Sequence, residues 1–402
     1  MRRWGEWLRR HWWVVPIAIF IAARLFSGIL LMMEADRQIA LVPSVGELGP
    51  HISHAIEASP SYSGVLTNWD GQWYWQVADH GYPHTLPRDS SGVVQQNTWN
   101  FYPMLPVTAR LVSAVSPLGF PWAAACVSLV AAGIGIVILY RWLQTSSNTF
   151  NAFTATLALS MHPGAYVFQI AYAEGLAFLF LMIALRALSR RKYLAVAISC
   201  VLLGLTRPVG LPLVLVIGVH GLLRWRERGV DPFGPRERLK VLVTGVVAGA
   251  SFFLWPAITG WVVGDWQASQ ETRQAWALGG PWITWLSTIA RGNPLLAVVA
   301  IILLLILADV LLNPRARAWP TELRWWSGTY AVYIAAVAQA TFIPIRYALL
   351  MPIPWWPFPL QRNPRPAVWA LVGAIIVLIG GFLQWWDIHT FYIMAPNTRA
   401  SI

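Results

Sequence analysis

The sequence predicts an all-α membrane protein that crosses the bilayer many times. Hydrophobic residues make up 57% of the chain and charged residues only 11%, and the mean hydropathy is +0.53. Apolar runs of about 20 residues recur along the sequence, and this is the length that a helix needs to cross a bilayer. No stretch of ordinary polar composition is left for a sizeable soluble domain, so we expect residues 1–402 to form a single integral membrane domain.

The first span is predicted near the N-terminus. The Arg-rich segment MRRWGEWLRRHWW leads into an apolar run over residues 12–33 that is too long for a signal-peptide core. We expect it to be retained, with the N-terminus in the cytoplasm. Arg24 lies within this run, about 20 Å from the cytoplasmic edge. Its side chain either snorkels to the headgroups or faces the bundle as a cation near the functional site.

The first loop on the outer side covers residues 34–120, which is far longer than a turn between two membrane helices. Its segment 68–106 holds four Trp and three Tyr, which favour the headgroup layer. The spacing predicts an in-plane helix over 71–80, with Trp69, Trp73 and Val77 on one face and Asp70 at its N-terminal edge. A second in-plane helix is expected after Pro106.

The remaining spans follow from residue 121 onward and bring the total to about ten. Short runs between 151 and 224 leave a re-entrant hairpin there as an alternative. The loops that this arrangement puts in the cytoplasm are rich in Arg, as orientation in a membrane requires. The predicted spans lie near residues 121–143, 151–170, 174–189, 192–206, 209–224, 240–263, 293–312, 327–344 and 366–386.

Charge and cysteine content exclude other classes. The net charge of +12 resides in short Arg clusters between apolar runs, so no soluble basic face is left for a nucleic acid. Cys126 and Cys200 both fall in apolar runs and are expected to be small core residues without a disulfide. His80 and His84 lack a second set of plausible ligands and are interpreted as interface histidines, so we expect no metal ion and no cofactor.

A set of polar residues collects on the predicted outer side. Each has an ordinary explanation as a helix cap, a helix-dipole partner or a headgroup anchor. Together, carboxylates and arginines beside an aromatic in-plane segment suit an anionic lipid substrate. The residues are Asp70, Asp79, His80, Tyr172, Glu174, Thr206, Arg207, the segment 266–276, Arg346 and Tyr347.

Four ordered motifs resemble the PIG-V type of mannosyltransferase. They are WDGQWYWQVADHGY, FYPMLP, QIAYAEGLAF and GLTRPVG, and they cover about 140 residues of the chain. One departure is Trp73, where members often carry His. The resemblance implies a GT-C fold, a catalytic carboxylate in the first outer loop and a polyprenyl-phosphate sugar as donor.

The resemblance also implies roles for individual residues. Asp70 fits the general base for the acceptor hydroxyl, and Arg207, Arg346 and Arg24 would hold the donor phosphate. The expected reaction is transfer of a mannosyl residue, with inversion, to a glycolipid or glycan acceptor on the outer face. The expected substrate-binding residues are Trp69, Trp73, Asp79, His80, Tyr82, Tyr102, Tyr172, Glu174 and Tyr347.

Other classes remain open. A lipid or small-solute transporter would need a polar pathway near the middle of the membrane, whereas the polar residues gather at one side. A membrane O-acyltransferase or a lipid phosphatase would need a nucleophile or phosphate cluster that the sequence does not display. The acceptor and the linkage are not fixed by the sequence.

Overall fold

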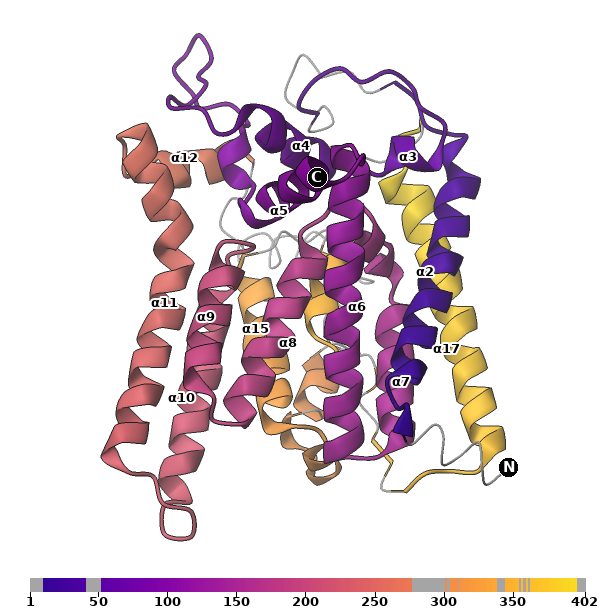
Figure 1. Ribbon diagram of the computed structural model, residues 1–402, viewed down its shortest axis with the longest axis vertical. Coiled ribbons are helices and arrows are strands. Elements are labelled where there is room, and N and C mark those ends of the chain that lie inside the picture. The colour runs from indigo at the N-terminus through magenta and orange to yellow at the C-terminus, as the bar shows by residue number, and fades with distance from the viewer. Residues whose placement is uncertain are drawn as a thin grey trace.

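The computed structural model describes residues 10–40, 52–276, 301, 304–309, 311–337, 344–353, 356, 359–360 and 362–395. All named elements in these ranges are helices (Figure 1). The α-helices are α2 (Val14–Ala35), α3 (Tyr62–Val65), α4 (Asp70–His80), α5 (Met104–Val115), α6 (Phe120–Ser146), α7 (Thr149–Ser160), α8 (Glu174–Ser189), α9 (Tyr193–Gly204), α10 (Gly210–Arg226), α11 (Pro235–Val263), α12 (Ala268–Ala275), α15 (Thr321–Val337), α16 (Pro344–Tyr347) and α17 (Pro366–Asp387). The 3-10 helices are η1 (Thr98–Asn100), η2 (Pro163–Gln169), η3 (Pro314–Ala318) and η4 (Ala348–Leu350), and a π-helical turn, η5 (Ile388–Tyr392), continues α17.

The long helices form a bundle whose centre is α6 and α8 (Figure 1). On one flank α8 packs against α9, and α10 and α11 follow; on the other, α2 and α17 pack against α7. Phe150, Phe168 and Phe178 are fully buried between these helices. Apolar burial therefore holds the bundle together and leaves its two ends for polar residues.

Among the described residues four helices are long and apolar enough to cross a membrane: α2, α6, α11 and α17 with its continuation. The bent pair of η2 and α8 would make a fifth. The described residues do not confirm about ten spans. The helices α7 and α9 have 12 residues each, about 18 Å, against about 30 Å of hydrocarbon. A run of apolar residues does not reveal where a helix breaks. Of the predicted span 293–312 only residues 301, 304–309, 311 and 312 are described, and of the span 327–344 only residues 327–337 and 344.

Large apolar side chains cover the outside of the bundle. On α11, Leu242, Val246 and Phe253 are each at least 60% exposed. In the most apolar part of α17 only 11% of the residues are buried. Apolar surface of this extent is unstable in water and stable against lipid tails. The protein is therefore a membrane protein, as the composition predicts.

A sharp bend interrupts the predicted span 151–170. The helix α7 ends at Ser160, η2 follows, and η2 and α8 meet at an angle of 97°. Pro163 cannot continue the hydrogen-bond ladder of α7, which explains the break. This geometry is a broken span or a re-entrant loop, so the alternative of a re-entrant hairpin stays open here. The bend carries residues 170–174 into the interior beside α4.

The predicted in-plane helices lie together across one end of the bundle. The helix over 71–80 is found as α4, and the second one as α5 at Met104–Val115 (Figure 1). The helix α12 lies at the same end, where Arg88 pairs with Glu271 at 2.6 Å. The connections from α8 to α9 and from α10 to α11, and the start of α15, lie at the other end. The segments predicted for opposite membrane faces thus occupy opposite ends of the bundle.

The close contact of α9 with α11 depends on Gly204. A Cβ at this position would lie 2.4 Å from the carbonyl oxygen of Ser251. We expect Gly204→Ala to destabilise the protein by about 1–3 kcal/mol, because the backbones would have to separate. Thermal unfolding in detergent measures this. Gly218→Ala is the control, since a Cβ there meets nothing within 4 Å. Equal unfolding temperatures for the two variants would contradict the packing argument.

Candidate active site

The site begins at the turn that leads into α4. Trp69 has a φ of +54°, which a residue other than glycine rarely adopts, and Asp70 is the first helical residue. Two contacts hold the turn: the indole of Trp69 donates to the carbonyl of Tyr392 at 2.9 Å, and Asn68 exchanges two amide hydrogen bonds with Gln38. Strain of this kind costs about 1–3 kcal/mol and often marks functional sites. Here the contacts of Asn68 and Trp69 hold the turn and with it the position of Asp70.

Two carboxylates and two guanidinium groups alternate in one chain of ion pairs. Nη2 of Arg346 lies 2.8 Å from Oδ2 of Asp70, and its Nε lies 3.8 Å from Oε1 of Glu174. The same Glu174 oxygen accepts from Nη2 of Arg207 at 2.5 Å. We call these four residues the ion-pair chain. They come from α4, α16, α8 and the connection between α9 and α10.

Tyrosine rings flank both arginines. The guanidinium carbon of Arg346 lies 5.3 Å from the ring centre of Tyr172 and 5.1 Å from that of Tyr347. Arg207 lies 5.3 Å from the Tyr347 ring as well. Such cation–π contacts fix the planes of the guanidinium groups. The structure thus brings together six of the predicted site residues, which are far apart in sequence.

The Asp70 end of the ion-pair chain is the more exposed one. The Glu174 side chain is 1% exposed and that of Arg207 13%, whereas Arg346 and Asp70 reach 21% and 22%. A ligand therefore reaches the Asp70 end first. Burial lowers the pKa of the Arg346 guanidinium, but the Asp70 carboxylate more than offsets this and raises the pKa well above its ordinary value. Arg346 stays charged at any physiological pH.

Several polar atoms of the site are buried without a hydrogen-bond partner among the described residues. They are Nε of Arg207, Nε of Arg346 and Oε2 of Glu174. Buried polar groups are nearly always paired, so unpaired donors on two neighbouring arginines leave capacity for an oxygen-rich ligand. Chemically, the site offers a carboxylate that can take a proton and two cations that can hold an anion.

The aromatic residues of the segment 68–106 pack against one another. Trp73 stacks on Phe101 with ring centres 5.6 Å apart, and Tyr82 stacks on Trp99 at 4.6 Å. The hydroxyl of Tyr82 donates to the carbonyl of Phe101 at 2.8 Å. Tyr102 lies 5.8 Å from the ring of Trp255, and burial raises its pKa to about 12. These rings hold α4 against the loop and α11, so their expected contact with substrate stays a prediction.

Three further predicted site residues have other surroundings. Asp79 and His80 are exposed at the C-terminal end of α4, about 15 Å from Asp70 along the helix. Arg24 is 6% exposed and donates to the backbone carbonyls of Ser160, at 2.6 Å, and Ala165. It therefore fastens α2 to η2. Of the two alternatives for Arg24, these contacts favour a side chain that faces the bundle over snorkelling. A Cβ at Gly164, next to Ala165, would lie 3.1 Å from Cα of Arg346.

Two neighbours of the site were not anticipated. Tyr74 is 3% exposed, one helical turn after Asp70, and burial raises its pKa beyond the ordinary range. Its i+4 spacing from Asp70 is the signal that could have identified it. Tyr392 lies under Trp69, and nothing in its local sequence indicates this contact. Among the described residues no group of three His, Cys, Asp or Glu side chains could hold a metal ion.

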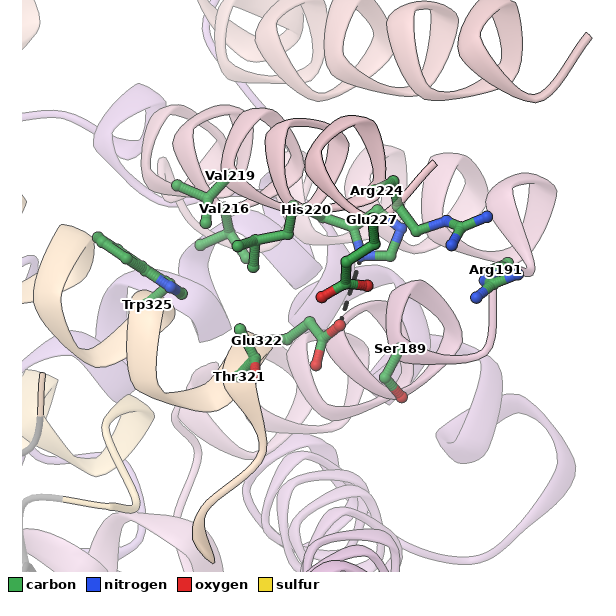
Figure 2. A pocket seen from close by; sticks show the side chains of 11 residues that line it. Ser189, Arg191, Val216, Val219, His220, Arg224, Glu227, Thr321, Glu322 and Trp325 are labelled. Carbon is green, nitrogen blue, oxygen red and sulfur yellow. Dashed lines mark ion pairs between the residues drawn. The ribbon is translucent and has the colours of Figure 1, made fainter. Parts of the chain in front are cut away.

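A separate cavity of about 190 Å³ lies where α8 and α10 end and α15 begins (Figure 2). Across it, Nδ1 of His220 lies 3.4 Å from Oε1 of Glu322. Glu174 begins α8 and Ser189 ends it, so the cavity is about 20 Å from the ion-pair chain. The α8 residues between the two regions, 175–185, carry no polar side chain. The two polar regions are therefore separate.

Comparison with known proteins shows the fold. No family model matches the chain, and neither does any curated protein sequence. Solved structures of the oligosaccharyltransferase AglB of the archaeon Archaeoglobus fulgidus are similar. Its apo form has a TM-score of 0.52 at 13% identity over 98% of this chain, and its complex with an inhibitory peptide and a dolichol-phosphate has 0.50 at 13% over 97%.

The match covers 57% of the length of the archaeal enzyme. The chain thus shares the helical fold of the matched part of that enzyme, in agreement with the predicted all-α class, whereas about ten spans are not confirmed. The comparison does not show that the chain belongs to the PIG-V type.

Proposed function

We propose that the protein is a membrane glycosyltransferase that takes a sugar from a polyprenyl phosphate. One observation carries this proposal: the Asp70 carboxylate lies 2.8 Å from Arg346, which Glu174 links to Arg207. A base beside two cations is what transfer from a phosphate leaving group to a hydroxyl needs. The fold supports the proposal, because the archaeal neighbour with this fold is an oligosaccharyltransferase and one of its structures contains a dolichol-phosphate.

The proposed reaction is a single displacement at the anomeric carbon. Asp70 accepts the proton of the acceptor hydroxyl while that oxygen forms a bond to the carbon. The bond from the carbon to the phosphate oxygen breaks, and its electron pair leaves with the phosphate. Arg346 and Arg207 hold the additional negative charge that develops there. One displacement inverts the configuration, and a phosphate leaves without a general acid, so one carboxylate suffices.

Arginine takes the place of a metal ion in this proposal. A donor with a single phosphate carries less charge than a nucleotide diphosphate, and two guanidinium groups can match its oxygens with paired hydrogen bonds. Arg207 and Arg346 each have a buried Nε without a hydrogen-bond partner among the described residues. Both therefore keep donors for phosphate oxygens while they pair with carboxylates. No cofactor is needed.

The alternative of a transporter receives less support. A transport pathway needs polar groups through the bundle, and the apolar stretch 175–185 of α8 separates the ion-pair chain from the cavity at the other end. A polar site at one end is better suited to chemistry on a lipid at one face of the membrane.

Mannose as the sugar and a glycolipid or glycan as the acceptor follow from the PIG-V resemblance of the outer-loop motifs. Purified protein supplied with labelled polyprenyl-phosphate mannose and a panel of lipid and glycan acceptors tests both. We expect labelled mannose on one acceptor class, with inverted anomeric configuration. A preference for polyprenyl-phosphate glucose would refute mannose, and a retained configuration would refute the single displacement.

The proposed sidedness places the ion-pair chain on the outer face, where nucleotide sugars are absent. Single cysteines at Ser91 and Arg236 test this in a Cys126→Ala, Cys200→Ala background. Both positions are exposed; Ser91 follows α4, and Arg236 is at the start of α11, which is at the other end of the bundle from α4. We expect an impermeant thiol reagent to label position 91 in intact cells and position 236 only after permeabilisation. The reverse pattern would put Asp70 in the cytoplasm and remove the reason for a lipid-linked donor.

A further inference from the structure

In this structure the proposed base, Asp70, already has an ion-pair partner. Oδ2 of Asp70 lies 2.8 Å from Nη2 of Arg346, so one oxygen of the proposed base faces a guanidinium. Within the proposed mechanism the same Arg346 also has to hold the donor phosphate. One cation thus has two anionic partners, the carboxylate of the base and the phosphate of the donor.

We propose that Asp70 and the donor phosphate compete for Arg346, so that donor binding releases the base. This inference rests on the proposed function. Without donor, Arg346 holds one oxygen of Asp70, and the guanidinium charge competes with a hydroxyl proton for the carboxylate. With donor, Arg346 turns to the phosphate and Asp70 becomes available to the acceptor. Binding then has an order, donor before acceptor, which prevents activation of water or acceptor in an empty site.

The two arginines are held differently, and this difference supports the exchange. Arg207 is held at 2.5 Å by Glu174, whose side chain is 1% exposed. Arg346 is 21% exposed, lies 3.8 Å from Glu174 and belongs to the four-residue helix α16. Arg207 is therefore the more firmly held cation, and Arg346 is the one that can exchange a carboxylate for a phosphate.

Tyrosines guide the rotation of Arg346. The rings of Tyr172 and Tyr347 lie 5.3 Å and 5.1 Å from its guanidinium carbon. A cation between two aromatic faces keeps favourable contacts while its N–H groups change partner. Charge supports the exchange as well. The ion-pair chain has two positive and two negative groups, so it is formally neutral, and an incoming phosphate gains most by displacing a carboxylate from its arginine.

The experiment measures the affinity of the purified protein in nanodiscs for polyprenyl phosphate, the product that carries the phosphate alone. Asp70→Asn removes the competing charge, so we expect it to bind polyprenyl phosphate about tenfold more tightly than wild type, within the usual range of coupling between two ligands. Asp36→Asn is the matched control, because Asp36 is an exposed carboxylate directly after α2, and its affinity should be unchanged.

A double-mutant cycle separates competition from simple repulsion between two anions. If Asp70 acts through Arg346, the gain from Asp70→Asn disappears in an Arg346→Gln background. A gain of the same size in that background would overturn the inference, as would equal affinity of wild type and Asp70→Asn. Failure of every variant and of wild type to bind polyprenyl phosphate would instead refute the proposed function itself.

Discussion

Asp70→Asn should slow sugar transfer by about 10² to 10⁴-fold, the usual effect of removing a general base. The amide keeps the shape of the side chain and an oxygen that can accept from Arg346, so α4 and its turn should stay in place. The measurement is kcat/KM for labelled transfer, together with the unfolding temperature of each variant.

Asp36→Asn is again the control, since it removes an exposed carboxylate outside the ion-pair chain. Near wild-type transfer by Asp70→Asn would show that another group takes the proton. A large fall in unfolding temperature would show instead that Asp70 is mainly a structural partner of Arg346.

Replacement of Arg346 by Lys should lower kcat/KM by about 10- to 100-fold. Lys keeps the charge but lacks the planar fork that can face a carboxylate and a phosphate at once. The loss corresponds to one charge-assisted hydrogen bond, about 1.5–3 kcal/mol. Arg207→Lys should have a similar effect, because its fork already uses Nη2 for Glu174. Both the rate and the affinity for polyprenyl phosphate should fall.

The control for these variants is Arg88→Lys. Arg88 lies between α4 and η1 and pairs with Glu271 at 2.6 Å, but its side chain is 42% exposed. Exposed pairs contribute little, so this variant should behave as wild type. If the Lys variants of Arg207 and Arg346 also bound polyprenyl phosphate with wild-type affinity, neither arginine would belong to the donor site.

Local patterns predicted the elements that carry the site. The in-plane helix expected over 71–80 is α4 at Asp70–His80, since its aromatic spacing and turn residues are local properties. A count of membrane crossings places Glu174, Arg207 and Arg346 on one side of the membrane and so predicts that they belong together. The three residues do meet in the ion-pair chain, although the number of membrane spans that the prediction assumed is not confirmed.

Other features depend on contacts that no local pattern contains. Arg24 is a cation within an apolar run, as a site residue could be. Its guanidinium nevertheless donates to two backbone carbonyls that lie more than 130 positions away in the sequence. The support of Trp69 by Tyr392 joins residues 323 positions apart. Hydropathy also does not predict the break between α7 and η2, because the apolar run continues through it. Pro163 nevertheless prevents the helix from continuing.

The central claim is that sugar leaves a polyprenyl phosphate in this protein. Purified protein in sealed liposomes, supplied with labelled polyprenyl-phosphate mannose and membrane lipid acceptors, tests it most directly. We expect labelled mannose to appear on an acceptor while an equal amount of free polyprenyl phosphate accumulates. Movement of intact labelled donor across the membrane without cleavage, or transfer from a nucleotide-linked mannose alone, would contradict the claim.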